Sequence, residues 1–405
     1  MAERIAVDVL VVGAGAAGMM CAIEAGRRGR RVLVVDHARA PGEKIRISGG
    51  GRCNFTNTGT GVANMLGENP RFAASALKRY TPQDFIKTVD RAGIAWHEKT
   101  LGQLFCDDSA KQIVRMLTDQ MREASVTLRL NTGVASVERG AGGFDAVLSD
   151  GATVRAASLV LATGGKSIPK MGATGWAYET ARRFGLRVTD TRPALVPLTF
   201  ETGLLEQLAS LAGVAVDVEA RAMPSESRAG AASPAFREAM LFTHRGLSGP
   251  AILQISSYWR EGEAIVLDMA PGAAVDQKLK AAKTENGKQA VHTALAQIVP
   301  RRLAEAITAR EGVQGKLAEI GDARLKGLAA AIHGWAVKPV GSEGYRTAEV
   351  TLGGIDTAAL DQQTMAVPTV PGLHAVGEAV DVTGWLGGYN FQWAWSSGWA
   401  AGQAC

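Results

Sequence analysis

The stretch that decides the fold is Val7-Asp-Val-Leu-Val-Val-Gly-Ala-Gly-Ala-Ala-Gly18. Its apolar β-branched residues predict a strand buried on both faces, and 16–29 then reads as a helix. Gly13, Gly15 and Gly18 have the G-x-G-x-x-G spacing. The first glycine permits a tight turn, the second lets the backbone approach a pyrophosphate, and the third lets helix and strand pack closely. Free N–H groups at the helix start would then face phosphates.

A second apolar strand, 32–35, ends at Asp36, which is placed to accept hydrogen bonds from a ribose hydroxyl. A lone G-x-G-x-x-G also occurs in ordinary turns. Here a strand, a helix, a second strand and a terminal acid occur together, and this combination predicts a Rossmann-type dinucleotide-binding domain.

Composition sets broad limits on the protein. A chain of 405 residues with 46% apolar and 20% charged residues is typical of a soluble globular protein with two or three domains. The net charge of +5 is read as a mild excess spread along the chain, so a nucleic-acid surface is not indicated. Four cysteines without a CxxC pair suggest neither a disulfide framework nor a zinc site, and no metal site is expected. With neither a signal peptide nor a membrane-spanning run, a cytoplasmic protein is expected.

Residues 41–57 form a glycine-rich, polar stretch with Lys44, Arg46 and Arg52. No helical or strand period fits it, so we expect a long loop. Three successive glycines would let its backbone lie flat against a ligand, with Ser48 and Asn54 supplying hydrogen-bonding groups. The alternative is a connector with solvated cations.

Further elements follow from local patterns. Amphipathic helices are expected at 82–93 and 109–123, a small hairpin at 94–106, and strands at 126–130, 133–138, 146–149 and 153–157. A separate buried strand at 158–161 ends in Ala162-Thr-Gly-Gly165, where small residues allow a flat ligand to approach the backbone.

The predicted fold is α/β: a split Rossmann-type FAD-binding domain with an inserted β-rich, barrel-like domain and a helical subdomain. The FAD-binding domain comprises 1–191 and 351–405, the β-rich substrate domain 192–274 and 336–350, and the helical insert 275–335. The last segment contains Gly377-Glu378, then Asp381, then a glycine loop that enters a helix near Tyr389.

FAD fits this arrangement better than NAD. Nothing in the middle of the chain repeats the glycine fingerprint, and the isoalloxazine of FAD needs contacts from distant segments. Gly377-Glu378 with Asp381 could hold ribitol hydroxyls. The positive end of the helix near Tyr389 would favour an anionic reduced ring.

Several motifs carry a family resemblance. Residues 9–18, Ala162-Thr-Gly164 and 377–381 resemble the glutathione-reductase-type flavoprotein superfamily. More narrowly, 44–57, Phe242-Thr-His-Arg-Gly-Leu-Ser-Gly-Pro250 and Gly387-Gly-Tyr-Asn-Phe-Gln-Trp-Ala394 resemble the BaiN-like, or aminoacetone-oxidase-family, bacterial flavoproteins. The resemblance implies FAD, the split domain and the inserts. Its family names invoke amine oxidation and the reduction of steroid-like enones. Relatives often have Gly-Asp in place of Gly377-Glu378, so the ribitol contact is assigned mainly to Asp381.

The expected cofactor-binding residues come from every part of the split domain. They are Gly13, Ala14, Gly15, Ala16, Ala17, Gly18, Asp36, His37, Lys44, Arg46, Ser48, Gly51, Arg52, Cys53, Asn54, Val134, Ala162, Thr163, Gly164, Gly165, Gly377, Glu378, Asp381, Gly387, Gly388, Tyr389 and Asn390.

The catalytic candidates are His244 and Tyr389 as proton donors and Arg52 as a cation near the pyrophosphate or the flavin ring. A structural role is the more common alternative for each of these two proton donors. Cys53 lacks a CxxC partner, so a packed cysteine is favoured over a redox thiol.

The preferred hypothesis is an FAD-dependent oxidoreductase that transfers hydride between flavin and a small or flat organic molecule, with NAD(P)H as a transient visitor. The alternatives are a flavin-dependent protein that modifies or binds RNA, an amine oxidase that uses oxygen, and a non-catalytic flavin sensor. No dense Lys/Arg stripe with interleaved aromatics supports the RNA hypothesis. Composition leaves the oligomeric state open.

Overall fold

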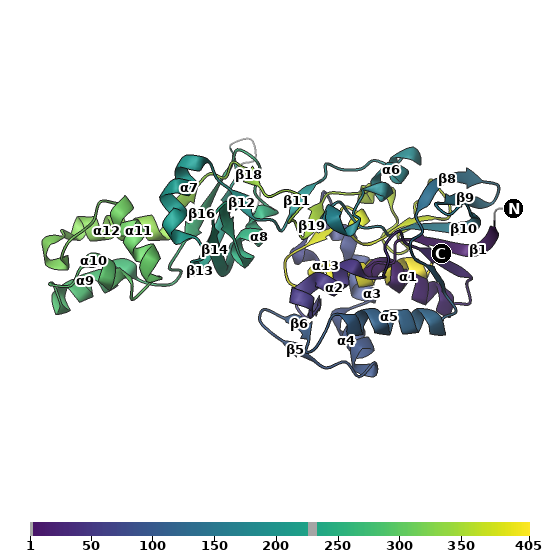
Figure 1. The fold of residues 1–405 in the computed structure, drawn as a ribbon, viewed down its shortest axis with the longest axis horizontal. Coiled ribbons are helices and arrows are strands. Elements are labelled where there is room, and N and C mark those ends of the chain that lie inside the picture. The colour runs from purple at the N-terminus through teal and green to yellow at the C-terminus, as the bar shows by residue number, and fades with distance from the viewer. Residues whose placement is uncertain (1–2, 226–232) are drawn as a thin grey trace. The chain divides into compact units, whose positions relative to one another are not determined.

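The computed structural model describes residues 3–225 and 233–405. The chain forms two compact units (Figure 1). The first unit contains Met1–Arg192 and Val350–Cys405, and the second contains Pro193–Glu349. The mixed α/β class with a Rossmann-type sheet is confirmed.

The first unit is organised around a seven-stranded sheet. Its strands occur in the order β7 (Thr127–Arg129), β2 (Val32–Val35), β1 (Arg4–Val12), β10 (Thr153–Leu161), β9 (Gly143–Leu148), β8 (Val134–Gly140), with β20 (Leu373–Ala375) also paired to β10. The pairs β7–β2, β2–β1, β1–β10 and β10–β20 are parallel, whereas β9 and β8 continue antiparallel. Val9 to Val12 are buried, as the apolar run predicts.

The prediction of two strands at 153–157 and 158–161 is wrong, because both segments belong to the single strand β10. Its first half pairs with β9 and alternates between exposed and buried residues. Its last residues, Leu159–Leu161, lie between β1 and β20 and are all buried. The change from an alternating to a continuous apolar pattern therefore reflects a change of neighbours within one strand.

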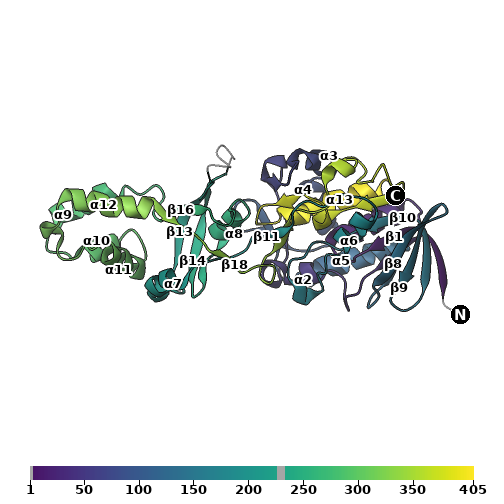
Figure 2. The same cartoon turned by 90° about the horizontal axis from the view of Figure 1, so that it is seen from above.

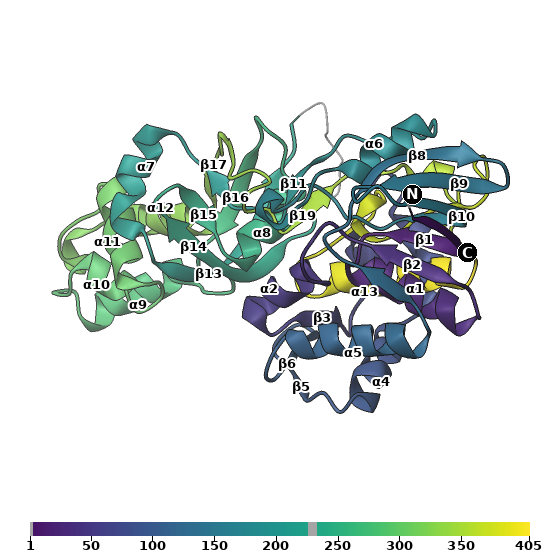
Figure 3. The same cartoon turned by 45° about the vertical axis from the view of Figure 1, so that its right-hand side comes forward.

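The helices of this unit include α1 (Ala16–Arg27), α3 (Ala74–Arg79), α4 (Pro82–Arg91), α5 (Lys111–Glu123), α6 (Trp176–Arg183) and α13 (Tyr389–Gly402). Of these, α1 packs against β1 and β2 of the sheet. α4 begins at a capping box, in which the Asp84 carboxylate accepts hydrogen bonds from Thr81 N and Thr81 Oγ1. α13 lies beside α1 (Figure 3) because Gly398 has no side chain: a Cβ there would lie 2.4 Å from the carbonyl oxygen of Ala17.

The expected long loop at 41–57 is also wrong. It contains α2 (Glu43–Gly51) and β3 (Asn54–Asn57). β3 pairs with β6 (Gln103–Cys106), which pairs with β5 (Trp96–Glu98), so the hairpin at 94–106 is confirmed. Ile45 and Phe55 are buried and hold the stretch against the core. The helical period is hidden because Gly49, Gly50 and Gly51 all have positive φ.

The second unit contains an antiparallel seven-stranded sheet with the order β17-β16-β13-β14-β15-β12-β18. The strands are β12 (Leu198–Thr199), β13 (Ala215–Met223), β14 (Phe236–Thr243), β15 (Gly246–Ser248), β16 (Ala264–Asp268), β17 (Trp335–Val337) and β18 (Gly341–Ser342), with helices α7 (Thr202–Leu208) and α8 (Pro250–Ser256). Over residues 3–225 and 233–405, β17 and β18 end the sheet without pairing to each other, so the sheet is open where a barrel-like closure was expected. These end strands have only three and two residues.

A helical insert separates β16 from β17 in this unit. It contains α9 (Val275–Glu285), α10 (Val291–Leu295), α11 (Arg301–Arg310) and α12 (Asp322–His333). Figure 2 shows α9 beside α12 and α10 beside α11. Leu279, Leu295, Leu303 and Leu325 are buried, so the insert has apolar contacts of its own. Within the described parts of the chain, every helix is too short or too polar to cross a membrane.

Candidate functional site

The glycine turn between β1 and α1 is closely packed on one side and open on the other. Gly13 has φ +112°, and a Cβ there would lie 2.4 Å from the carbonyl oxygen of Ala162. A Cβ on Gly18 would lie 1.9 Å from the Gly13 oxygen. At Gly15, by contrast, a Cβ would meet nothing within 4 Å. The turn, which includes Ala14, Ala16 and Ala17, therefore leaves open space beside Gly15, as a pyrophosphate cradle requires.

Asp36 follows β2 and lies against this turn. Its carboxylate accepts hydrogen bonds from Ala14 N (2.7 Å) and Ala38 N (2.8 Å). His37 is half exposed, with Nδ1 3.9 Å from Asp36 Oδ1. Thr132 N donates to the Asp36 carbonyl, which brings the start of β8 at Val134 to the same region. The structure thus brings together three of the expected cofactor contacts, Asp36, His37 and Val134.

The segment after β10 supplies a polar group without a partner. Thr163 Oγ1 is buried and makes no hydrogen bond within residues 3–225 and 233–405. Buried hydroxyls are normally satisfied, so an orphaned one in this cradle fits a site that a polar ligand completes. Gly164 has φ +71°, and a Cβ on Gly165 would lie 2.4 Å from Thr351 Oγ1.

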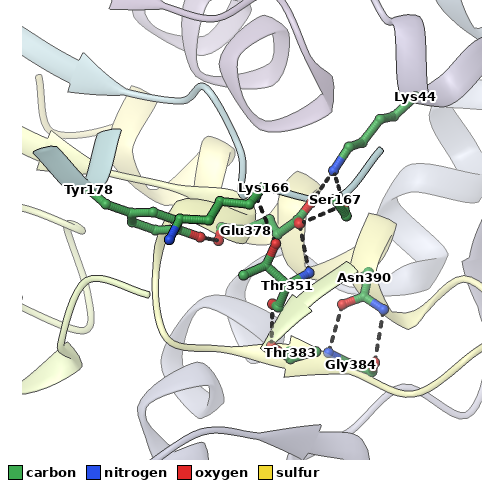
Figure 4. A network of polar contacts seen from close by, with 9 residues as sticks. All are labelled: Lys44, Lys166, Ser167, Tyr178, Thr351, Glu378, Thr383, Gly384 and Asn390. Atoms are coloured by element: carbon green, nitrogen blue, oxygen red, sulfur yellow. Dashed lines mark hydrogen bonds and ion pairs between the residues drawn. The ribbon is translucent and has the colours of Figure 1, made fainter. Parts of the chain in front are cut away.

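Glu378 is the centre of a polar network (Figure 4). Its Oε2 lies 2.8 Å from Lys44 Nζ, and its Oε1 accepts a hydrogen bond from Thr351 N at 2.9 Å. Ser167 Oγ lies 2.6 Å from Lys44 Nζ and 3.2 Å from Glu378 Oε1. Lys44 and Glu378 were expected as separate cofactor contacts, but the structure pairs them with each other.

The same network extends to other segments of the first unit. Lys166 N donates to Thr351 Oγ1 (2.8 Å), Thr383 Oγ1 donates to the Thr351 carbonyl (3.1 Å), and Tyr178 Oη donates to the Glu378 carbonyl (3.3 Å). Sequence reasoning missed Ser167 and Thr351. Ser167 follows Gly164-Gly165-Lys166, which is a weak signal, whereas Thr351 on β19 (Val350–Leu352) has none.

α2 approaches the glycine turn directly, because Gly42 N donates to the Ala14 carbonyl at 2.9 Å. Two predicted contacts make local hydrogen bonds: Arg46 Nε donates to the Pro41 carbonyl and Ser48 Oγ to the Ile45 carbonyl. Gly51 ends the helix, and its carbonyl accepts a hydrogen bond from Ala110 N.

Arg52 and Cys53 follow α2 and have opposite environments. Arg52 is exposed, and within residues 3–225 and 233–405 its guanidinium forms neither a hydrogen bond nor an ion pair. Cys53 is fully buried with φ +53°. Burial raises the pKa of the Cys53 thiol far above its ordinary range, so the thiol stays protonated. This environment matches the packed cysteine rather than a redox thiol.

The start of α13 is fixed by glycines and an amide. Gly388 has φ +95°, and a Cβ there would lie 2.4 Å from the Thr56 carbonyl oxygen. The Asn390 side chain accepts from Gly384 N (2.7 Å) and donates to the Gly384 carbonyl (2.9 Å). Tyr389 is the first residue of the helix, is mostly buried, and packs edge-on against Trp385.

Two further side-chain contacts join this region to β3. The Asn54 amide lies 3.3 Å from Gly388 N, and its oxygen accepts this hydrogen bond once the amide is flipped; Asn57 Nδ2 donates to the Gly387 carbonyl at 2.9 Å. Gly377 packs against the start of α1, and its N–H donates to Ser397 Oγ at 3.0 Å. The two ends of the chain thus meet at the glycine turn.

Asp381, which was expected to hold the ribitol, makes an internal contact. Its Oδ2 accepts a hydrogen bond from Glu68 N at 2.9 Å, and the residue is 2% exposed. Burial raises the pKa of its carboxyl. Glu68 in turn pairs with Arg187, which also binds Asp356. Asp381 is therefore the buried member of a polar cluster in the first unit, in which Glu68 and Arg187 are exposed.

His244 lies in the second unit, on the exposed turn between β14 and β15. The residues that the first unit brings together are the glycine turn, Asp36, Thr163, Glu378 and the start of α13. Those residues fit FAD: there is space at Gly15, an acid at the adenosine end and an unpartnered hydroxyl. When bound, FAD supplies hydride transfer.

Comparison with known proteins supports this assignment. The model of a family described as "HI0933-like protein Rossmann domain" matches residues 7–404. The chain is 50% identical over 404 residues to the "Ribosomal RNA dihydrouridine synthase" of Escherichia coli (strain K12), covering 98% of this chain and 97% of that one. It is 28% identical to the "3-dehydro-bile acid delta(4,6)-reductase" of Clostridium scindens, and the match covers 97% of this chain and 98% of that one.

The fold is also found among solved structures. A structure described as "Quinol-Fumarate Reductase with Menaquinol Molecules" matches with a TM-score of 0.51 and 15% identity, over 99% of this chain and 71% of that chain. At that identity the likeness concerns the fold alone. The family match and the cradle at Gly13–Gly18 identify FAD as the cofactor.

Proposed function

The chain belongs to the HI0933-like Rossmann-domain family, and we propose that it is an FAD-dependent reductase that converts a uracil base in ribosomal RNA to dihydrouracil. The observation that carries this proposal is the 50% identity to the E. coli relative, which extends over 98% of this chain. The match therefore includes the inserted second unit as well as the cofactor domain. The sequence patterns favoured a small-molecule substrate over RNA, and the identity to this relative supports RNA instead.

The reaction adds a hydride and a proton across the C5=C6 double bond of uracil. C6 is the electrophilic end because the bond is conjugated with the C4 carbonyl, so hydride goes to C6 and the proton to C5. A reduced nicotinamide cofactor supplies the two electrons, and a protein group must supply the proton. In this proposal Tyr389 donates that proton, since it is the first residue of the helix that follows the Gly387-Gly388 turn.

Arg52 and His244 have secondary roles in the proposal. Arg52 has an exposed guanidinium next to the positive-φ glycines of α2, and it would contact a phosphate or the flavin ring. His244, on an exposed turn of the second unit, is the second candidate proton donor. Replacing each by alanine and measuring flavin reduction separately from product formation assigns its role.

A second candidate function is the reduction of a small conjugated enone. It is favoured by the 28% identity to the C. scindens reductase and by the resemblance to BaiN-like flavoproteins. A 3-oxo steroid with a Δ4 double bond and uracil share one chemical feature, a C=C bond conjugated with a carbonyl group. The same hydride geometry would serve both substrates.

The test uses the purified flavoprotein with unmodified ribosomal RNA transcripts and either NADH or NADPH. Nucleoside mass spectrometry should detect dihydrouridine in the product. The Tyr389→Phe variant should reduce product formation by about 10²- to 10⁴-fold, while flavin bleaching by the nicotinamide stays unchanged. Turnover of a dienone without any dihydrouridine would instead support the second candidate. If neither nicotinamide bleaches the flavin, both reductase proposals fail and amine oxidation by oxygen becomes the leading hypothesis.

A further inference from the structure

The second unit carries its charge unevenly. The helical insert, residues 275–335, has ten Lys and Arg against six Asp and Glu, a net charge of +4. The rest of the unit, 193–274 and 336–349, has seven Lys and Arg against eleven Asp and Glu, a net charge of −4. Within this unit the basic excess is therefore local, unlike the even spread suggested by the composition of the whole chain.

Ion pairs neutralise only part of the insert. Four cations pair with four carboxylates there, in the pairs Lys280–Asp276, Lys283–Asp322, Arg301–Glu305 and Arg310–Glu311. Six cations then face only two remaining carboxylates, Glu285 and Glu319. The surplus charge is thus carried by side chains outside these pairs.

Several of the surplus cations lie on adjoining segments. Ala290 forms an isolated antiparallel bridge with Lys316, and Leu317 N donates a hydrogen bond to the Gln289 carbonyl. Lys288 and Lys316 therefore lie on two neighbouring segments of the chain. Arg324 reaches back from α12 to the Gly312 carbonyl at 2.6 Å, at the turn that leads to Lys316. We call Lys288, Lys316 and Arg324 the basic cluster. All three are exposed.

We propose that the helical insert binds the phosphate backbone of ribosomal RNA through the basic cluster. This inference rests on the proposed function and adds the surface by which the substrate is held. Exposed cations that lack carboxylate partners gain most from phosphates, because binding releases the counterions condensed on the RNA. The one aromatic residue of the insert, Trp335, is buried, so the surface suits phosphate contacts rather than base stacking.

The experiment compares two triple variants of the full-length flavoprotein. Lys288→Gln/Lys316→Gln/Arg324→Gln removes the three charges of the cluster. Lys78→Gln/Lys111→Gln/Lys338→Gln removes three exposed lysine charges elsewhere and is the matched control. Binding of deproteinised ribosomal RNA is measured as log K against log salt concentration. Each lost phosphate contact lowers the magnitude of the slope by about 0.7 to 0.9.

The magnitude of the slope should fall by about 2 to 3 in the cluster variant, which should also bind RNA more weakly at low salt, while the control keeps the wild-type slope. Both variants should keep their FAD and its bleaching by the nicotinamide. If wild-type protein forms dihydrouridine and the two variants have equal slopes, the inference is overturned and the proposed function stands. If wild-type protein neither binds nor reduces ribosomal RNA, both are overturned.

Discussion

The Gly15→Ala substitution should weaken FAD binding while leaving the free energy of unfolding of the apoprotein nearly unchanged. A Cβ at Gly15 meets no atom within 4 Å, and its φ of −82° is accessible to alanine. Alanine should stabilise the apoprotein by about 0.4 to 1 kcal/mol by restricting the unfolded chain. A similar loss opposes this gain, because alanine is a poorer N-cap than glycine. The free energy of unfolding should therefore change by less than about 1 kcal/mol.

The same methyl group would occupy the space that a pyrophosphate needs. FAD affinity should fall at least tenfold, which corresponds to about 1.4 kcal/mol. FAD is titrated into deflavinated protein, and urea unfolding is followed on the same sample. Gly13→Ala gives the contrasting result: strain at φ +112° and a contact 2.4 Å from the Ala162 oxygen should destabilise the apoprotein by roughly 2 to 6 kcal/mol. Gly327→Ala, on α12 with no neighbour within 4 Å, is the control. If the Gly15→Ala variant bound FAD with wild-type affinity, the assignment of the Gly13–Gly18 turn as the pyrophosphate site would be refuted.

Three further predictions concern buried groups of the first unit. Burial raises the pKa of Asp381, so the folded protein binds this proton more tightly than the unfolded chain. Stability therefore increases as pH falls through the raised pKa of the folded protein towards the ordinary carboxyl pKa of the unfolded chain. Asp381→Asn should remove that pH dependence in urea unfolding of the apoprotein, and an unchanged difference between neutral and acidic pH would contradict it. Burial raises the pKa of the Cys53 thiol, so this thiol should react with thiol reagents only after the protein unfolds. The Cys53→Ala variant should keep the wild-type rate of flavin bleaching by the nicotinamide. A fall in that rate of about a hundredfold would instead assign Cys53 a redox role. Ser397→Ala leaves the buried Gly377 N–H without its acceptor and should cost about 1 to 3 kcal/mol in unfolding free energy, whereas Ser75→Ala on α3 should change it by less than about 0.5 kcal/mol.

Local sequence patterns were sufficient to predict the structure at the start of the first unit. β1, the glycine turn, α1 and Asp36 were predicted because a strand, a turn and a helix each leave a short-range pattern in sequence. β10 was divided in two because its neighbours change along its length, which sequence alone does not reveal. α2 was missed because its glycines at positive φ interrupt any helical period.

The polar network around Glu378 could not be predicted from local sequence patterns. Lys44 and Glu378 are 334 residues apart, and each has an equally reasonable role as a separate cofactor contact. Only the fold pairs them, and it adds Ser167 and Thr351, small polar residues that belong to no motif. Asp381 illustrates the same limit, since its internal partner, Glu68 N, is 313 residues away.

The packing of α13 against α1 sets an order for biosynthesis. α13, which completes the cofactor domain, is synthesised after the whole second unit, yet the Arg28 guanidinium at the end of α1 donates a hydrogen bond to the Gly402 carbonyl, 374 residues later. During translation, the apolar faces of α1 and β3 stay uncovered while 193–349 emerge and fold as a separate unit. Cofactor loading should therefore follow the synthesis of α13, and the nascent cofactor domain should depend on chaperones that protect exposed apolar surface.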